Sequence, residues 1–153
     1  MTAPTIRQLL SYRLHVVANL LSRGAEMRYR REHDVSLWEW RTVALLGAEA
    51  PQSLATLARA AGVDKAQMSR VVSGLAARGV VARDDDARDA RAVRLSLTAK
   101  GRRLYKGLIR TATERDEAFL GELSAAERKA LDAALAKLAS RARDDIQAEK
   151  AAP

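Results

Sequence analysis

The sequence predicts a mainly α-helical protein with one small β-hairpin. Along most of the chain, apolar residues recur at steps of three and four, which is the period of an amphipathic helix. Hydrophobic residues make up 48% of the chain and aromatic residues only 4%, so the core is expected to consist of Leu, Ala and Val, as in packed helices. The pattern changes only in residues 80–98, where Val93, Leu95 and Leu97 alternate with polar residues. That alternation is typical of a strand with one buried face.

Length and composition limit the class of protein. At 153 residues the chain is one domain, or one domain with helical extensions. A net charge of +8 suits a polyanion, most often nucleic acid, with a membrane surface second and a merely solvated basic surface as the alternative. The absence of cysteine excludes disulfides and thiolate metal sites. With no secretory signal and no apolar run of about 18 residues, we expect a soluble, cytoplasmic protein with no membrane partner.

Two helices are predicted in the first third of the chain. The first runs from Ile6 to about Arg31, because apolar residues at helical spacing lie on one face. These residues are Ile6, Leu10, Leu14, Val17 and Leu21. The second helix follows Ser36, a suitable N-cap with Glu39 three residues later, and Gly47 and Pro51 are expected to stop it.

The next segment has the pattern of a helix-turn-helix unit. A short helix over 54–61 ends at Gly62, and Asp64 caps a second helix with Gln67 placed to complete a capping box. Two short helices joined by a tight turn with glycine form such a unit, although an ordinary helical hairpin shows the same apolar spacing. Gly79 is expected to end the second helix in the left-handed conformation.

The outward face of this second helix favours a nucleic-acid partner. No Asp or Glu occurs between Lys65 and Ala82, in a chain with 19 acidic residues. The face carries donors that reach base edges and phosphates in a major groove. These candidates are Lys65, Gln67, Ser69, Arg70 and Ser73.

The predicted hairpin leads into a long helix. Its tip is almost wholly charged, and Thr98 after its second strand is suited to cap the helix that follows. Lys100, Arg102 and Arg103 lie in the first turn of that helix. Because cations at a helix N-terminus oppose the helix dipole, we expect a negative group nearby.

The last helix begins with a second capping box, Ser124 and Glu127. Its apolar residues form a seam with a seven-residue repeat, able to dock on its own domain or on another copy. These residues are Leu131, Leu135, Leu138, Ala142 and Ile146. The tail from Ala148 to Pro153 is expected to fray, and no domain boundary is apparent.

The order of these elements resembles the MarR (multiple antibiotic resistance regulator) family of winged helix-turn-helix transcription regulators, over nearly the whole chain. The resemblance is carried by Leu37, Trp40, Arg41 and Val43, by 57–79, and by DARDARAVRLSLTAKG at 86–101, which looks like the family's wing and its LTxxG strand exit. It implies one domain over 1–153, with a winged helix-turn-helix DNA-binding lobe over 36–101. The N- and C-terminal helices, 5–31 and 102–147, would then be dimerisation helices.

The resemblance also implies how the wing contacts DNA. In the family a wing Arg enters the minor groove, held by an Asp two residues earlier, and the matching residues here are Arg91 and Asp89. A narrow minor groove attracts a guanidinium, and a fixed carboxylate pre-orients it. The alternative interpretation is that Asp89 and Arg91 form only an exposed ion pair, worth about 0–1 kcal/mol. Ala87 and Ala90 stand where many family wings have Pro and a basic residue, a charge that Arg88 is placed to replace.

Many family members are repressors released by small aromatic or phenolic molecules. By resemblance, the residues that would line such a pocket are Tyr12, His15, Trp38, Trp40 and Arg41. Trp38 is the best candidate for stacking on a ligand, because the apolar face of its helix does not need it. The other residues also have ordinary structural explanations.

Together these observations predict a homodimeric repressor that binds double-stranded DNA at a pseudo-palindromic operator. Neither an enzyme, a metal nor a cofactor is expected. His15 and His33 lack metal-ligand spacing to each other, and no nucleophile elbow or phosphate-binding glycine loop occurs. The alternatives are a nonspecific nucleoid-type DNA-binding protein and a helical protein-interaction module.

Overall fold

The computed structural model describes residues 5–86 and 89–152, with the backbone alone described at 85, 86 and 89–92. The chain divides into two compact units, residues 1–111 and 112–153, and one long helix runs from the first unit into the second. The prediction that both belong to a single domain stays a prediction.

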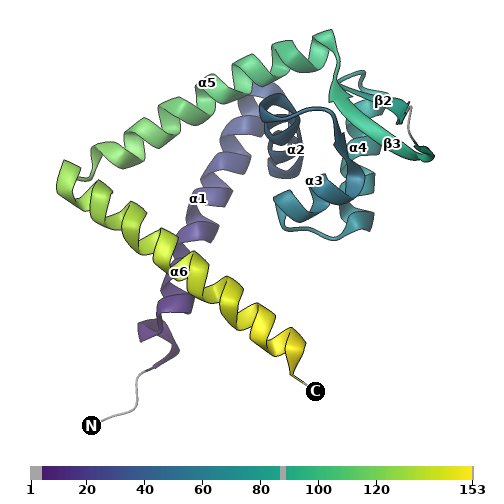
Figure 1. Ribbon diagram of the computed structural model, residues 1–153. Coiled ribbons are helices and arrows are strands. Elements are labelled where there is room, and N and C mark those ends of the chain that lie inside the picture. Colours follow the sequence, from purple (N-terminus) through teal and green to yellow (C-terminus); the bar gives the residue numbers. More distant parts are fainter. Residues whose placement is uncertain (1–4, 87–88, 153) are drawn as a thin grey trace. The chain divides into compact units, whose positions relative to one another are not determined.

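The elements confirm a mainly helical protein with a small antiparallel sheet (Figure 1). In chain order they are the 3-10 helix η1 (Ile6–Gln8), α1 (Leu10–His33), α2 (Leu37–Ala48), β1 (Gln52–Ser53), α3 (Leu54–Ala61), α4 (Lys65–Ala77), β2 (Val81–Asp86), β3 (Asp89–Leu97), α5 (Ala99–Gly121) and α6 (Ala125–Ala151). Helix α3 has the predicted bounds, and α4 begins directly after its predicted cap. Helix α2 does not stop at Gly47 as predicted but continues to Ala48, since a glycine inside a helix costs only about 1 kcal/mol.

The sheet has three strands in the order β1-β3-β2, one more than the predicted hairpin. The hairpin pairs Val81 with Leu97 and has an irregularity between Asp85 and Asp86. The additional strand, β1, pairs Gln52 with Leu95. Two residues are too few to show a period in the sequence, so β1 could not be predicted from alternation.

One apolar position of β3 is not buried as predicted. Leu95 and Leu97 are 2% and 5% exposed, whereas Val93 is 44% exposed. The pairing with β1 extends only to Arg94, so Val93 lies beyond the three-stranded part of the sheet. At Val93 the hairpin extends beyond the hydrophobic core. The alternation of apolar and polar residues does not show how far along the strand the helices cover the sheet.

The first helix differs from its prediction at both ends. Residues 6–8 form a 3-10 turn, Leu9 is extended with ψ 136°, and α1 begins only at Leu10. The turn is closed locally, because the Thr5 amide donates to the Gln8 side chain over 2.8 Å. The helix continues to His33, two residues beyond the prediction, and ends where Asp34 adopts a left-handed φ of 53°.

The predicted caps form with one exception. Around Ser36, the Ser36 amide donates to Glu39 Oε2 over 2.7 Å and the Glu39 amide donates to Ser36 Oγ over 3.2 Å. Ser124 and Glu127 form the same reciprocal box before α6. At α4 the Asp64 carboxylate accepts from the amide of Gln67 over 2.7 Å. Within the described residues the Gln67 side chain returns no bond to Asp64, so only half of that box forms.

The core lies where α2, α3, α4, the sheet and α5 meet. Its largest fully buried side chains come from all five of these parts: Val43 and Leu46, Leu57, Met68, Val72 and Leu75, Leu95, and Leu108. Burial of this kind stabilises by about 1.5–3 kcal/mol per side chain. The inward face of α4 is therefore firmly anchored, which fixes the direction of its outward face.

The end of α4 is joined closely to the start of α5. Gly79 has φ 68°, and the Val80 amide donates to Leu75 O over 2.9 Å, as in a Schellman motif. Thr98 Oγ1 accepts from the Gly101 amide over 3.0 Å and donates to Gly79 O over 2.7 Å, so Thr98 is the predicted cap. A Cβ on Gly101 would lie 2.1 Å from Val80 O, which explains the glycine.

Carbonyl oxygens, rather than a carboxylate, accept from two of the cations in the first turn of α5. Lys100 Nζ donates to Arg78 O over 2.8 Å, and Arg102 Nη1 donates to Leu97 O over 2.7 Å. The negative partners are thus the partial charges of backbone groups.

In the second unit, α6 continues through Ala151, where the predicted tail was expected to fray from Ala148. Its apolar seam is exposed in this chain, with Leu131 42%, Leu135 44% and Ile146 54% exposed. Among the described residues, no helix has the length and apolar character needed to cross a membrane.

Candidate nucleic-acid interface

Helix α4 presents its predicted donors from a fixed base. Lys65, Arg70 and Ser73 are exposed, and Gln67 and Ser69 are partly exposed. Because the opposite face of α4 is locked into the core, these side chains project from a backbone that cannot easily rotate. Such a helix can enter a major groove without first becoming ordered.

The hairpin is tied to α4 by a hydrogen bond that sequence reasoning did not reveal. Arg83 Nη2 of β2 donates to Ser73 Oγ over 2.8 Å. Ser73 was predicted to reach bases or phosphates, but here its hydroxyl accepts from Arg83. This hydrogen bond joins residues that are ten positions apart and lie on two different elements, so no local sequence pattern predicts it. Arg83 thereby becomes an additional cation on the surface shared by α4 and the hairpin.

The predicted residues of the hairpin tip are only partly covered by the structure. Asp89 and Arg91 belong to β3, but their side chains are not described, and Arg88 lies outside the described residues. The pairing of Asp89 with Arg91 therefore stays a prediction.

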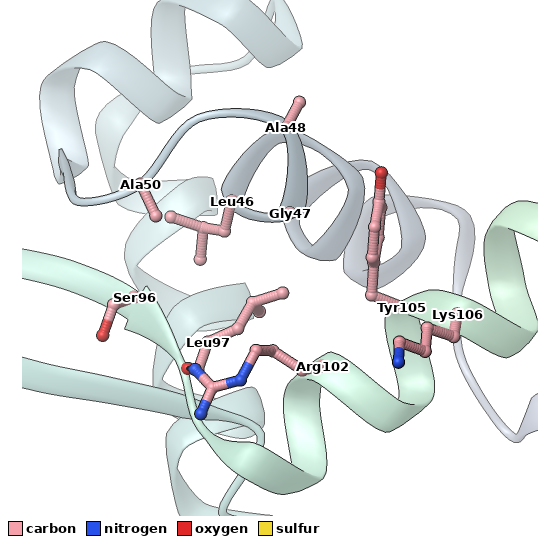
Figure 2. A pocket seen from close by; sticks show the side chains of 9 residues that line it. All are labelled: Leu46, Gly47, Ala48, Ala50, Ser96, Leu97, Arg102, Tyr105 and Lys106. Carbon is pink, nitrogen blue, oxygen red and sulfur yellow. Dashed lines mark hydrogen bonds between the residues drawn. The ribbon is translucent and has the colours of Figure 1, made fainter.

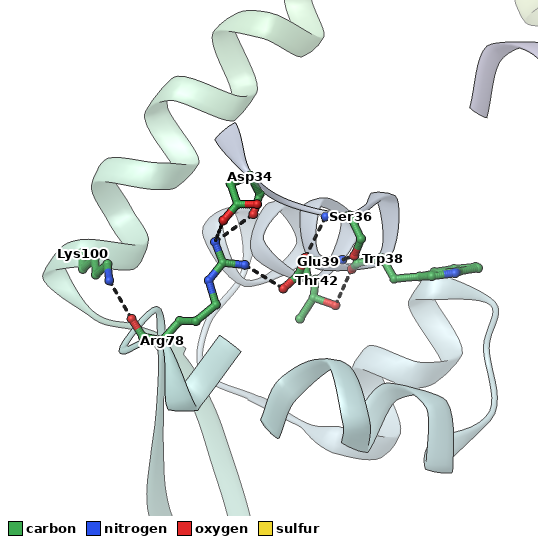
Figure 3. A network of polar contacts seen from close by, with 7 residues as sticks. All are labelled: Asp34, Ser36, Trp38, Glu39, Thr42, Arg78 and Lys100. Carbon is green, nitrogen blue, oxygen red and sulfur yellow. Dashed lines mark hydrogen bonds and ion pairs between the residues drawn. The ribbon is translucent and has the colours of Figure 1, made fainter. Parts of the chain in front are cut away.

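A polar network holds the end of α4 against the junction of α1 and α2 (Figure 3). Arg78 Nη1 donates to Glu39 Oε1 over 2.9 Å, and Nη2 donates to Asp34 O over 2.8 Å. The other Glu39 oxygen accepts from the Ser36 amide, so Glu39 caps α2 and holds Arg78 at the same time. Since the Arg78 side chain is 38% exposed, the contribution of the ion pair to stability is modest. Its geometric effect is to fix the exit of α4.

The five residues predicted to line a ligand pocket do not all line the same pocket. Trp40 and Arg41 line a pocket of about 350 Å³ with Ala44, Leu45, Ala60 and Ala61, whereas Tyr12, His15 and Trp38 are not part of that lining. The guanidinium of Arg41 lies 4.8 Å from the centre of the Trp38 ring, so one face of the predicted stacking residue is already in contact with a cation. The Trp40 ring packs on Tyr29 at 5.1 Å.

The other two predicted pocket residues lie in the first half of α1. His15 Nε2 and Asn19 Nδ2 are 2.8 Å apart, which gives the imidazole an ordinary partner, and Tyr12 is half-buried. Whether any of the five residues binds a ligand stays a prediction. As for metals, no cluster of three or more His, Cys, Asp or Glu occurs in the described part of the chain.

Among the side chains that the structure describes, two carboxyl groups have a pKa that is clearly shifted. Hydrogen bonds from Arg31 and Arg28 hold the pKa of Glu32 below its ordinary value of 4.5, against the opposing effect of burial. The hydroxyl and the amide of Ser124 likewise lower the pKa of Glu127. Both groups belong to helix ends, so their shifts indicate structural bonds.

Comparison with known proteins agrees with this geometry. A family model described as "MarR family" matches residues 33–92, which span the helix-turn-helix and most of the hairpin. The HTH-type transcriptional repressor NicR of Pseudomonas putida is 36% identical over 90 residues, covering 59% of this chain and 57% of NicR. The aligned segment therefore spans little more than half of that relative.

Solved structures extend the likeness to nearly the whole chain. A MarR/EmrR family transcriptional regulator from Acinetobacter sp. ADP1 is 26% identical, with a TM-score of 0.84 over 92% of this chain and 99% of that one. BpsR of Bordetella bronchiseptica, whose DNA binding is regulated by 6-hydroxynicotinic acid, has a TM-score of 0.79 at 22% identity, covering 90% of this chain and 98% of that chain. At that identity the likeness to BpsR concerns the fold alone.

These relatives confirm the predicted winged helix-turn-helix fold, and as transcription regulators they agree with the expectation that the chain is not an enzyme. The family model covers the helix-turn-helix and most of the hairpin, and the Acinetobacter structure covers nearly all of the remainder. The chain is thus similar to MarR family transcription regulators, by sequence over residues 33–92 and by fold over nearly its whole length.

Proposed function

We propose that this protein is a sequence-specific DNA-binding transcription regulator, and that it acts as a homodimeric repressor released by a small aromatic or phenolic ligand. The observation that carries the proposal is the shared surface of α4 and the hairpin. There the exposed Lys65 and Arg70 lie on a helix whose other face is buried. Arg83 donates across to Ser73 on the same helix.

Specific DNA binding follows from the chemistry of that surface. Arg and Lys side chains make bidentate contacts with guanine and charged contacts with phosphate. No acidic residue lies between Lys65 and Ala82, so nothing on α4 itself repels a phosphate backbone. The hairpin then reaches the neighbouring minor groove, with Arg91 as the entering residue and Asp89 as its holder.

A homodimer is supported by an uncovered apolar face on α1. The predicted stripe is exposed in the single chain, with Ile6 63%, Leu10 51%, Leu14 41%, Val17 54% and Leu21 40% exposed. A contiguous apolar surface of this kind marks an interaction site, and a second copy presents the same surface. Two-fold symmetry would place the half-sites of the operator about 10 base pairs apart.

Repression and ligand release are supported by the relatives and by one pocket. NicR is named a repressor, and BpsR responds to an aromatic acid. In this chain the pocket beside Trp40 and Arg41 offers an aromatic ring and a guanidinium, groups that suit an aromatic anion. The proposal therefore predicts that binding of an aromatic anion releases the protein from DNA.

The test of DNA binding is selection of bound fragments from random DNA, followed by measurement of affinity for the selected sequence. We expect Lys65→Gln and Arg70→Gln each to cost about 1–3 kcal/mol on the selected site if the residue reads a base. Lys129→Gln on α6 removes the same charge far along the chain and serves as the matched control. Equal competition by random DNA would instead indicate a nucleoid-type protein, and no DNA binding would leave the protein-interaction alternative.

The test of the dimer is sedimentation of the full chain. Leu14→Glu places a charge in the apolar stripe of α1 and is expected to shift the protein towards monomer. Asn19→Glu, on the opposite face of the same helix, is expected to leave the dimer intact. A monomeric parent protein at micromolar concentration, or equal behaviour of both variants, would contradict the homodimer.

A further inference from the structure

The turn between helix α4 and strand β2 is held from two sides (Figure 3). Arg78 is the C-cap of α4, and only Gly79 and Val80 separate it from the start of β2 at Val81. Its side chain reaches the junction of α1 and α2, and its carbonyl oxygen accepts from Lys100 Nζ of α5 over 2.8 Å. One residue between the two parts of the candidate DNA surface is thus tied to three other helices.

The Arg78 guanidinium bridges the end of α1 and the start of α2. Nη1 donates to Glu39 Oε1 over 2.9 Å, and Nη2 donates to Asp34 O over 2.8 Å. Both acceptors are themselves held, since the other Glu39 oxygen accepts from the Ser36 amide and Asp34 closes α1 with a left-handed φ of 53°. Because a planar forked donor fixes direction as well as distance, these bonds set the position of the end of α4.

Arg78 is placed to act through α4 and not on DNA itself. Helix α4 has 13 residues from Lys65 to Ala77, so about 20 Å of helix separates Arg78 from the first exposed cation of α4. Two of the three guanidinium nitrogens are already bonded within the protein. The pair with Glu39 is partly exposed and adds little to stability, so the main effect of the fork is on geometry.

We propose that Arg78 is a positioning residue for DNA recognition, which holds α4 and the hairpin at the angle in which both meet the duplex. The inference rests on the proposed function, because it concerns the surface that would bind DNA. Without the fork, the turn at 78–80 loses its bonds to α1 and α2, and the two parts of the surface gain freedom to move. Base contacts specify sequence only when the donors are correctly placed, whereas attraction to phosphate is independent of sequence. Specific binding is therefore expected to fall more than nonspecific binding.

The experiment measures affinity for a selected site and for random DNA over a range of salt concentrations. Arg78→Gln is expected to weaken binding to the selected site by about three- to thirtyfold, with little change for random DNA and an unchanged salt slope. A phosphate contact would instead lower the slope by about one. Arg78→Lys keeps the charge but not the fork, and is expected to behave like Arg78→Gln.

Glu39→Gln separates positioning from charge. The change retains the capping box, since Gln also serves at this position. It removes a negative charge, so electrostatics alone would tighten binding to a polyanion, whereas loss of the bond to Arg78 is expected to weaken binding to the selected site. Glu49→Gln is the matched control, because Glu49 is exposed and its side chain has no hydrogen bond or ion pair within the described residues.

Hydrogen–deuterium exchange of the free protein tests the positioning without DNA. The amides of residues 75–82 are expected to exchange faster in Arg78→Gln than in the parent and in Glu49→Gln, at a temperature where all three are folded. If the parent shows no selective DNA binding, the proposed function fails, and the exchange result still decides whether Arg78 holds this turn.

Four results would each overturn the positioning role. They are unchanged exchange at residues 75–82 in Arg78→Gln, a salt slope lowered by about one in that variant, parent-like specific binding by Arg78→Lys, and binding of the selected site by Glu39→Gln as tight as by Glu49→Gln.

Discussion

Replacement of Gly101 by alanine tests how closely α5 approaches the end of α4. The added Cβ would lie 2.1 Å from Val80 O and 3.2 Å from Leu97 Cδ2. Because an unstrained C···O contact is about 3.3 Å or longer, the first turn of α5 would have to move by roughly 1 Å. Val80 O also accepts from the Thr98 amide over 3.1 Å, so the movement would stretch that bond.

The expected cost can be worked from these contacts. Overpacking costs about 1–3 kcal/mol and a weakened hydrogen bond about 1 kcal/mol. The higher helix propensity of alanine returns up to about 1 kcal/mol. We therefore expect Gly101→Ala to lower the free energy of unfolding by about 1–3 kcal/mol.

The assay is urea unfolding at a fixed protein concentration, since association would make stability depend on concentration. Gly74→Ala is the control, because a Cβ at Gly74 in α4 meets nothing within 4 Å. That variant is expected to be as stable as the parent or up to about 1 kcal/mol more stable. A Gly101→Ala protein as stable as Gly74→Ala would refute the close approach of α5 to Val80.

Three other predictions concern charged groups. Arg83→Gln is expected to weaken binding of all DNA sequences alike and to reduce the salt slope by about one, measured by fluorescence anisotropy; an unchanged slope would contradict a phosphate contact. Arg78 and Glu39 are expected to show a coupling of about 0.2–1 kcal/mol in a double-mutant cycle, and additive effects would exclude their ion pair in solution. Because the bond from Ser124 lowers the pKa of Glu127, the stabilisation it gives is present above the ordinary pKa of 4.5 and lost as pH falls through the lower folded value. Circular dichroism between pH 6 and 3 should therefore show less acid loss of helix in Glu127→Gln, and an identical loss would contradict the shift.

Much of the fold could be predicted because its signals are local. A capping box needs only residues three apart, and both Ser36 with Glu39 and Ser124 with Glu127 form as expected. Gly79 adopts the left-handed conformation that ends α4. In contrast, strand β1 depends on pairing with Leu95, more than forty residues later in the chain. The break at Leu9 leaves the apolar spacing on both sides unchanged, so periodicity does not reveal it.

The site was predicted less completely than the fold. The exposed face of α4 follows from the helical period, so the exposure of Lys65 and Arg70 could be predicted without the structure; their contact with DNA stays a prediction. The bond from Arg83 to Ser73 joins two elements whose relative placement the sequence does not encode locally. A pocket lined by Leu46, Leu97 and Arg102 is formed by segments of α2, β3 and α5 that are far apart in the sequence (Figure 2). No sequence motif therefore corresponds to it.

The central claim is that the surface shared by α4 and the hairpin recognises a particular DNA sequence. The most direct measurement is the ratio of affinities for a selected operator and for random DNA of the same length, at one stated salt concentration. The account predicts a ratio of at least about 10³, which falls markedly in Lys65→Gln or Arg70→Gln and is retained in Lys129→Gln. A ratio near one for the unaltered protein would contradict it.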